Sequence, residues 1–210
     1  MSWLERTELL VEKEGIEKLQ KANILVVGLG GVGSYAAEFI ARAGIHKMTI
    51  VDGDVFDETN KNRQLPALDS TIGKSKAQVL AARLKDINKD IQLTVIEEFL
   101  SPESAYEIVT KEFDYVLDCI DSITPKVNLI VAARRKKVKI ISSMGAGGKL
   151  DATKIKVADI GKTKNCTMAR VLRKRLKERK VDKGVKAVYS EEIQISKSLK
   201  VTDGTNFKKS

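Results

Sequence analysis

The chain has 210 residues, of which 42% are hydrophobic and 31% are charged, a composition typical of a soluble globular domain. It has no run of eighteen apolar residues and no secretory apolar segment near its start, so we expect a cytoplasmic protein without a membrane span. Cys119 and Cys166 stand far apart and in no metal-type spacing, which argues against a disulfide or a zinc site.

The net charge of +10 is unevenly distributed. Residues 162–186 carry +9 of it, with eleven Lys or Arg and only two acidic residues. A strongly basic segment indicates a polyanionic partner such as a nucleic acid, although a solvated helix face would show the same pattern.

The first predicted element is a helix over residues 4–20. Leu9, Leu10, Ile16 and Leu19 can form an apolar stripe that packs on another surface, and Gly15 is the expected break.

A buried strand follows at residues 24–27 and stops at a glycine cluster. Gly28, Gly30 and Gly33 fit the G-x-G-x-x-G pattern of a strand, a phosphate-binding turn and a helix whose N-terminus attracts anions. The helix is predicted to bury Ala37 and Phe39 on one face. A second strand, residues 48–51, ends in Asp52, at the distance from Gly33 where a ribose-binding carboxylate is expected.

Residues 52–72 lack sustained periodicity and are predicted to be a long functional loop. The next predicted elements alternate between helix and strand: a helix at 76–87, a strand at 91–96, a helix from 102, a strand at 115–119, a helix at 125–136 and a strand at 138–142. This alternation predicts an α/β fold with a doubly wound, mainly parallel sheet.

The pattern changes after residue 142. We predict a turn at 144–148, a strand at 154–160, a helix capped by Thr167, and short strands at 185–189 and 192–195, which together form a smaller mixed α/β region. Met168, Val171, Leu172 and Leu176 are expected to face inward. Four residues are expected to face solvent and to contact the phosphates of a nucleic acid: Arg173, Lys174, Arg175 and Lys177. Residues 202–210 are polar and expected to be loose.

The residues around the predicted crevice favour phosphate chemistry over hydride transfer. His46 lies in a turn and no substrate domain is evident, which argues against a dehydrogenase. Cations near a triphosphate neutralise charge that develops in nucleotidyl transfer, and Asp121, at the end of a parallel strand, is placed to hold Mg²⁺. The polar and cationic candidates that follow Asp52 are Asp54, Asn60, Asn62, Arg63, Gln64, Lys74 and Lys76.

An ordered set of short motifs resembles the adenylating enzymes of the ubiquitin-activating ThiF/MoeB/HesA superfamily. The set comprises the residues at 28–34, 52–54, 59–64, 73–76 and 118–122, and the resemblance covers about residues 6–148. It implies that a substrate carboxylate attacks the α-phosphate of ATP, which releases pyrophosphate and leaves an acyl-adenylate.

The resemblance also implies roles for single residues. Gly28, Gly30, Gly31 and Gly33 line the approach to the phosphates and ribose, and Asp52 binds the ribose hydroxyls. Further nucleotide contacts are implied for the group Asp54, Asn60, Asn62, Arg63, Gln64, Lys76 and Ser122. Arg63 and Lys76 balance charge in the transition state, Asp121 coordinates Mg²⁺, and Arg6 completes the site of a neighbouring subunit, which implies a homodimer.

One branch matches further. The residues at 118–127, 142–151, 162–164 and 170–176 resemble the tRNA threonylcarbamoyladenosine dehydratases, and the paired zinc cysteines of carrier-protein activators are missing. The resemblance implies ATP-dependent activation of the modified adenosine next to the anticodon, closure of a ring, and tRNA and a sulfur-transfer protein as partners. Members of that branch continue with a further apolar segment, so it also implies that this chain is truncated or a short variant.

The predicted organisation is a single adenylating domain over 1–210. It has an N-terminal helical segment at 1–22, a nucleotide-binding core at 23–148 and a basic C-terminal region at 149–210. Two alternatives stay open: an activator that adenylates the C-terminus of a ubiquitin-like or sulfur-carrier protein, and a nucleotide-binding module without chemistry. Cys166 is either a nucleophile or a structural thiol at a helix start.

Overall fold

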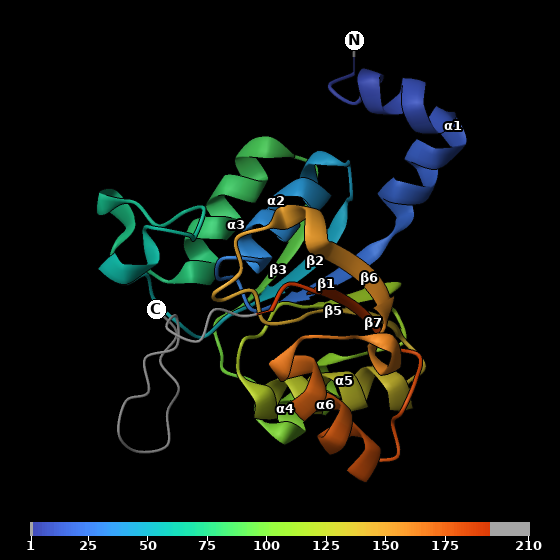
Figure 1. Cartoon of the computed structure of the whole chain (residues 1–210). Coiled ribbons are helices and arrows are strands. Elements are labelled where there is room, and N and C mark those ends of the chain that lie inside the picture. Colours follow the sequence, from blue (N-terminus) through green and yellow to red (C-terminus); the bar gives the residue numbers. More distant parts are fainter. Residues whose placement is uncertain (1, 194–210) are drawn as a thin grey trace.

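The computed structural model describes residues 2–193 and contains one seven-stranded sheet (Figure 1). The strands are β1 Asn23–Val27, β2 Lys47–Val51, β3 Gln92–Ile96, β4 Tyr115–Asp118, β5 Lys139–Ser143, β6 Ile155–Asp159 and β7 Lys186–Ser190. Their order across the sheet is β3-β2-β1-β4-β5-β7-β6. Every neighbouring pair is parallel except β6 with β7, so the predicted doubly wound α/β fold is confirmed.

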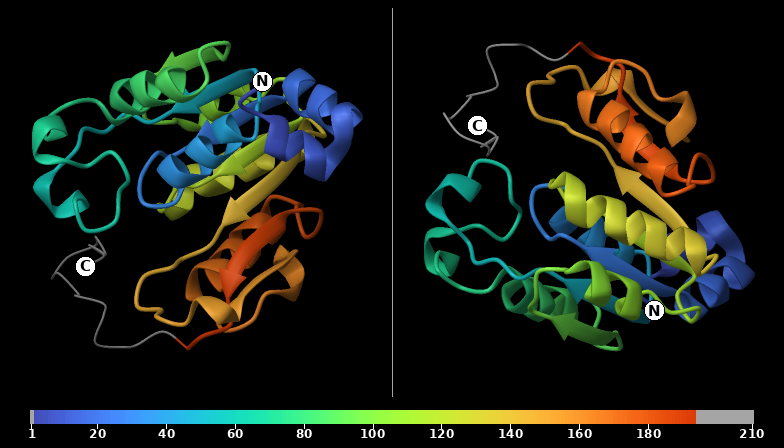
Figure 2. Two further views of the ribbon diagram at one scale, coloured as in Figure 1. Left: turned by 90° about the horizontal axis from the view of Figure 1, so that it is seen from above. Right: turned by 90° about the horizontal axis from the view of Figure 1, so that it is seen from below.

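Helices cover both faces of the sheet (Figure 2). They are α1 Glu5–Lys21, α2 Gly33–Arg42, α3 Lys76–Ile87, α4 Pro102–Ile108, α5 Ile123–Arg135 and α6 Thr167–Glu178. One apolar core joins the sheet to α2 and α3, and a second joins it to α4, α5 and α6. β1 is buried along its whole length because it lies between these two cores.

β1 and β4 are neighbours in the sheet. From β1 the sheet continues through β2 and β3 to one edge, and from β4 it continues through β5 toward the other edge, so the strand order reverses between β1 and β4. In open parallel sheets, ligands bind at such a switch point, outside the carboxyl ends of the strands. The chain leaves β1 at Gly28 and leaves β4 at Cys119, so these two turns face each other at that point.

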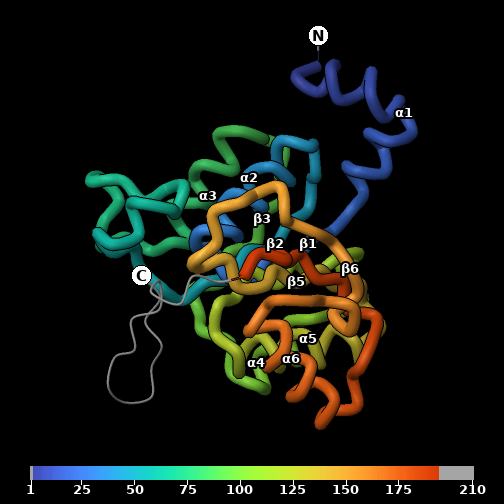
Figure 3. The backbone as a smooth tube through the Cα atoms, in the orientation of Figure 1, coloured from blue at the N-terminus to red at the C-terminus, as the bar shows by residue number. Residues whose placement is uncertain are grey.

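The long loop predicted at residues 52–72 extends from the end of β2 and is drawn in teal in Figure 3. It contains two short 3₁₀ turns, Glu58–Asn60 and Asp69–Thr71, and it returns to the sheet at α3. An isolated antiparallel bridge between Val55 and Ser75 closes the loop at its base.

The prediction of a break at Gly15 in the first helix is wrong. The kink falls at Glu12, whose φ of 60° and ψ of 171° are non-helical, and Gly15 lies within a helical turn. Ile16 is buried, but Leu9 and Leu10 are each 83% exposed. The expected apolar stripe is therefore buried only in its second half, and Leu9 and Leu10 stay largely exposed within the described structure.

Three local predictions at other helices are also wrong. Phe39 is 66% exposed, because the buried face of α2 is formed by smaller side chains such as Ala37 and Ala41. Thr167 does not cap α6: Cys166 occupies the N-cap position and provides no side-chain hydrogen bond. Arg173 is half-buried and does not face solvent.

The predicted strand at 192–195 is wrong where the structure describes it. Glu192 and Ile193 are not in a strand, and the rest of the predicted strand at 192–195 lies outside the described residues, as does the segment 202–210. Within residues 2–193, no helix combines the length and the apolar character that a membrane crossing needs.

Candidate active site

A cavity of about 480 Å³ lies at the carboxyl ends of β1, β2 and β4. Its wall includes ten of the residues predicted for the site: Gly28, Gly30, Gly31, Asp52, Asp54, Arg63, Gln64, Lys76, Asp121 and Ser122. These residues come from five separate segments of the sequence, and the parallel topology gathers them at one edge of the sheet.

The glycine turn leaves no room for side chains at two positions. Gly28 has a φ of 85°, and a Cβ there would lie 2.9 Å from the backbone carbon of Cys119. A Cβ on Gly33 would lie 1.7 Å from the carbonyl oxygen of Gly28. Gly28 therefore lets the β1 and β4 turns approach each other, and Gly33 lets the start of α2 pack on the strand.

Asp52 is held rigidly in the wall of the cavity. Its Oδ2 accepts a hydrogen bond of 2.6 Å from the backbone N–H of Leu29, and its Oδ1 accepts one of 2.9 Å from Asp54 N–H. Each carboxylate oxygen keeps a further lone pair, so Asp52 can also accept hydrogen bonds from a ligand hydroxyl.

Lys76 supplies a buried cation at the start of α3. Its side chain is only 7% exposed, and Nζ lies 2.5 Å from Oδ2 of Asp54. The backbone N–H of Lys76 donates to the carbonyl of Asp54 at 3.0 Å, so the pair is fixed at both backbone and side chain. Ser75 caps the helix through Gln78 N–H. The N-terminus of α3 and the ammonium group together make this wall attractive to anions.

Arg63 and Gln64 end the turn that follows the first 3₁₀ segment. The Arg63 guanidinium is exposed and donates to the Thr59 carbonyl at 2.9 Å and to Oδ1 of Asn62 at 2.8 Å. Gln64 is buried, and its Oε1 has no hydrogen-bond partner in the described structure. A buried polar atom without a partner is costly, and a bound ligand is one way to satisfy it.

Four predicted site residues do not line the cavity. Asn60 is buried in a capping box in which Asp57 N–H donates to its Oδ1, and Asn62 holds Arg63. Gly33 lies beneath the turn, and Arg6 is exposed on α1. Phosphate contacts by Asn60 and Asn62 and the contribution of Arg6 to a second subunit stay predictions.

The sequence reasoning missed a fully buried ion pair behind the cavity. Lys126 Nζ lies 2.9 Å from Oδ2 of Asp118, and neither side chain is exposed to solvent. Lys126 also donates to the carbonyl of Ile120 at 2.8 Å, and Ser142 Oγ donates to the Asp118 carboxylate at 2.6 Å. Burial raises the pKa of Asp118, whereas these donors and the positive charge of Lys126 lower it. The network fixes the turn that carries Asp121.

Asp121 and Ser122 are exposed at the cavity wall, and Ser122 Oγ donates to Oδ1 of Asp121 at 3.4 Å. The residues 2–193 hold no group of three or more His, Cys, Asp or Glu side chains that could bind a metal by themselves. Mg²⁺ is commonly bound by one or two carboxylates together with substrate phosphates and waters, so a single carboxylate beside a phosphate-sized space is chemically suited to it.

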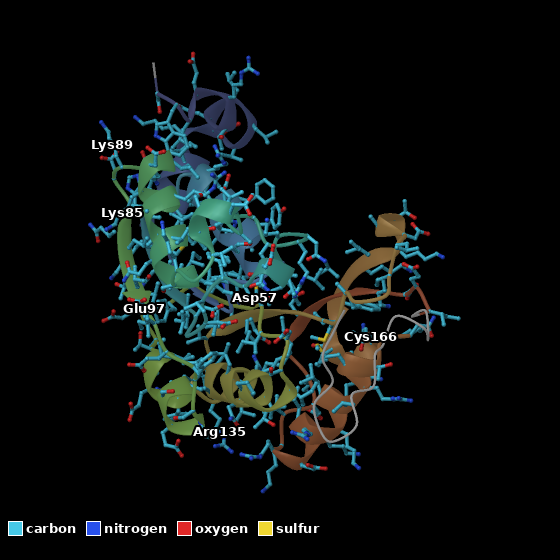
Figure 4. All side chains as sticks on the ribbon, turned by 90° about the vertical axis from the view of Figure 1, so that its left-hand side faces the viewer. Asp57, Lys85, Lys89, Glu97, Arg135 and Cys166 are labelled. Atoms are coloured by element: carbon cyan, nitrogen blue, oxygen red, sulfur yellow. The ribbon has the colours of Figure 1, made fainter. Side chains whose placement is uncertain are left out.

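Neither cysteine is placed to act as a nucleophile. Burial raises the pKa of the Cys119 thiol to about 12. Cys166 is buried at the start of α6, where Figure 4 labels it. The Cys119 thiol stays protonated and is therefore a weak nucleophile, and the burial of Cys166 favours a structural role for that residue.

Other residues of the wall carry no motif that would have revealed them. Phe99 follows β3 and is 75% exposed, and Met144 and Met168 come from the loop after β5 and from α6. A Cβ on Gly53 would lie 2.6 Å from the backbone nitrogen of Phe99, so the β2 and β3 turns meet closely there. Only the folded topology brings these segments to one cavity.

The basic face of α6 is less uniform than predicted. The Arg173 guanidinium donates to the Thr163 carbonyl at 3.2 Å and to the Thr163 hydroxyl, so it holds the loop before the helix. Arg175 donates to Thr124 Oγ1 at 3.0 Å on α5. Lys174 and Lys177 are exposed and take part in no ion pair among the described residues.

Comparison with known proteins agrees with this geometry. The model of the ThiF family matches residues 4–185. The tRNA threonylcarbamoyladenosine dehydratase of Bacillus subtilis is 40% identical over 190 residues, which are 90% of this chain and 75% of that protein. The Escherichia coli sulfur carrier protein ThiS adenylyltransferase is 34% identical over 139 residues, 65% of this chain and 55% of that protein.

A solved structure is also similar. The crystal structure of the E. coli tRNA N6-threonylcarbamoyladenosine dehydratase in complex with ATP has a TM-score of 0.87 and 39% sequence identity. The match covers 91% of this chain and 82% of that one.

Proposed function

The chain belongs to the ThiF family, and from that premise we propose that it is an ATP-dependent dehydratase acting on tRNA. It adenylates the carboxylate of N6-threonylcarbamoyladenosine and promotes closure of the cyclic form. The observation that carries the proposal is the cavity, where Asp52, Lys76, Arg63 and Asp121 converge around a glycine turn on the scale of a nucleotide site.

The proposed reaction has two steps, adenylation and ring closure. A carboxylate oxygen of the substrate bonds to the α-phosphorus of ATP, and the bond from that phosphorus to the pyrophosphate oxygen breaks. The neighbouring carbamoyl group then attacks the activated carbonyl, loses a proton as the ring closes, and expels AMP. Charge grows on the phosphate oxygens in the first step, so fixed cations at the cavity wall lower its barrier.

Different residues of this chain bind the ribose, admit the phosphates and stabilise the developing charge. Asp52, held by two backbone N–H groups, accepts hydrogen bonds from the ribose hydroxyls. Gly28 and Gly30 let the backbone approach the phosphates. Lys76 and Arg63 lie in the cavity wall, where Asp54 positions the Lys76 ammonium group and the Thr59 carbonyl positions the Arg63 guanidinium. The two cations stabilise the departing pyrophosphate.

In this proposal Asp121 would hold Mg²⁺, and Ser122 would orient the Asp121 carboxylate. When bound, Mg²⁺ would neutralise charge on the phosphates. Arg6 completes the site of a second copy, and the exposed Leu9 and Leu10 on the same helix offer apolar surface for that homodimer. A sulfur-transfer partner and a cytoplasmic location are part of the same proposal.

The exposed part of the basic α6 face would contact the tRNA backbone. Lys174 and Lys177 are free for this role, whereas Arg173 and Arg175 already bond within the protein. A guanidinium can keep an internal hydrogen bond and still contact a phosphate with its other donors, so all four residues stay in the proposed contact surface.

Adenylation of a carrier-protein tail is the second candidate, because a ThiS adenylyltransferase is among the relatives. The test is to incubate the protein with Mg-ATP and either threonylcarbamoylated tRNA or a carrier protein that ends in Gly-Gly, and to measure pyrophosphate release. We expect release with the modified tRNA and none with unmodified tRNA. Release with the carrier alone would replace the proposal by the second candidate, and release with neither would leave a binding module.

A further inference from the structure

A second pocket, of about 340 Å³, lies where α5 and α6 end. Its wall carries five cationic side chains and one carboxylate: Arg134, Arg135, Arg179, Lys180, Lys183 and Asp182. It shares no residue with the candidate active site. Arg135, labelled in Figure 4, marks its place in the molecule.

The pocket is built by two helix ends and one glycine turn. Gly184 has a φ of 79°, and a Cβ there would lie 2.5 Å from a guanidinium nitrogen of Arg134. Because residue 184 has no side chain, the Arg134 guanidinium can lie against the backbone there. Lys180 has a φ of 59° just beyond the end of α6, where glycine is usual. Arg134 is half-buried, so at least this cation is held in a defined place.

The cations of this pocket are not neutralised inside the protein. None of the five forms an ion pair within residues 2–193, although Asp182 stands in the same wall. Two helix C-termini contribute together about one negative charge as dipole ends. That is too little for five cations, even with Asp182. The remaining positive charge favours an external anion.

We propose that this pocket is a second phosphate site for RNA, which holds a part of the tRNA backbone remote from the reacting adenosine. Arginine side chains can bind a phosphate through two parallel hydrogen bonds. The residues that line this wall include no aromatic side chain on which a base could stack. The site therefore recognises the backbone and not the base sequence. This inference rests on the proposed tRNA substrate.

The helices fix the distance between the two sites. α5 begins at the active-site cavity, where Pro125 lines the wall, and ends at Arg135 after a length of thirteen residues. At a rise of about 1.5 Å per residue this helix spans roughly 20 Å. α6 starts near the same cavity at Met168 and ends beside the pocket, with Lys174 and Lys177 exposed on the way.

A separation of roughly 20 Å corresponds to about six base-pair steps at the roughly 3.4 Å spacing of B-form DNA, and to slightly more steps of an A-form RNA duplex, whose rise is shorter. We expect the part of the tRNA that reaches this pocket to be the stem next to the loop that carries the modified adenosine. This expected contact with the stem separates an anchoring pocket from a general attraction of a basic protein for RNA.

The test compares two double variants with equal loss of charge. Arg135→Gln/Lys183→Gln removes two exposed cations of the pocket, and Lys85→Gln/Lys89→Gln removes two exposed lysines that Figure 4 shows far from it. Affinity for full-length tRNA is measured against salt concentration. For the pocket variant we expect the slope of log K against log salt to fall in magnitude by about 1.4–1.8, because each lost phosphate contact contributes about 0.7–0.9. The control variant keeps the slope of the unchanged protein.

The same titration is repeated with an oligonucleotide that contains only the loop. Here the pocket variant should match the unchanged protein. An unchanged slope on full-length tRNA, an equal slope change in the control, or an equal loss on the loop alone would each overturn the inference. Pyrophosphate release by the unchanged protein, measured separately, tests the proposed function, so the two failures can be told apart.

Discussion

At the scale of single residues, the buried pair of Asp118 and Lys126 explains why the Asp121 turn keeps its shape. Lys126 reaches the Asp118 carboxylate and the carbonyl of Ile120, so one ammonium group joins the end of β4 to the turn that follows. Ser142 and the N–H of Ile120 also donate to the same carboxylate. A buried pair satisfied in this way specifies a geometry, although it need not add much stability over an apolar replacement.

Removing both partners of that pair should cost less stability than the two single removals added together. We expect Lys126→Met to lower the free energy of unfolding by about 3–5 kcal/mol, because Asp118 is left buried without its counter-charge. Asp118→Asn/Lys126→Met should cost clearly less than the sum of the two single changes. Urea unfolding of the four proteins in this cycle measures the coupling. Additive costs would show that the pair does not act as a unit.

Cys119 offers a second test at this scale. Burial raises the pKa of its thiol to about 12, so at pH 8 about one molecule in ten thousand carries the thiolate that reacts with alkylating agents. Below pH 12 the group stays protonated, and native protein treated with iodoacetamide should remain unmodified at Cys119 while urea-unfolded protein reacts. Mass spectrometry of the peptide that contains Cys119 gives the result. Fast modification of the native protein would contradict the raised pKa of this thiol.

Some of these residues were predictable and others were not. The spacing of Gly28, Gly33 and Asp52 reflects a backbone geometry that recurs wherever a strand, a glycine turn and a helix bind a nucleotide, so sequence alone placed them. Lys126 gave no signal, because a lysine in a helix is ordinarily solvated, and only the packing of β4 against α5 and β5 buries it. The capping role of Asn60 was hidden for a similar reason, since it depends on the fold of the loop.

At the scale of elements, α1 differs most from the expectation. Its kink falls at Glu12, and the residues before it leave Leu9 and Leu10 exposed together with Trp3. The apolar spacing predicted a buried face correctly for Ile16 and in part for Leu19, which packs against the core beside α2 and α3. A pattern in the sequence shows that a face is apolar, but it does not show whether the partner surface lies in the same chain.

The homodimer proposal gives that face a function that can be tested by mixing inactive subunits. Arg6→Ala and Asp121→Ala should each abolish AMP formation, and a mixture should regain part of it, because a hybrid dimer has one site with both groups intact. Subunit exchange is followed independently with differently tagged chains. Exchange without any return of activity would mean that each site is built within one chain.

α6 shows how a correct element can carry a wrong orientation. Its inward residues Leu172 and Leu176 are buried as predicted, and Lys174 and Lys177 are exposed. Arg173 differs because its long side chain reaches back to the Thr163 loop. Helical periodicity fixes the direction of the Cβ atom only, and an arginine stem can turn its charged end toward a nearby carbonyl.

At the scale of the whole molecule, the two apolar cores meet at β1 and leave one shared cavity at its carboxyl end. Lys76 and Arg63 come from the segments that follow β2 and place two cations in the wall of that cavity, as the proposed binding of a triphosphate requires. A dinucleotide fold of similar topology would instead need room for a second nucleoside and a hydride acceptor. The kind of nucleotide is therefore a property of the whole arrangement and not of the glycine motif alone.

Ligand-dependent stability tests this choice directly. A ligand that binds only the folded protein at one hundred times its Kd adds about 2.7 kcal/mol to the free energy of unfolding, which for a chain of this size raises Tm by about 5–10 °C. We expect a shift of that order with Mg-ATP and little shift with NAD at the same concentration, measured by thermal unfolding. Arg63→Ala serves as the control, since it removes a cavity cation without touching a core and should reduce the Mg-ATP shift while leaving the Tm of the unliganded protein nearly unchanged. A larger shift with NAD than with Mg-ATP would reject the adenylation site and restore a dehydrogenase as the better interpretation of the fold.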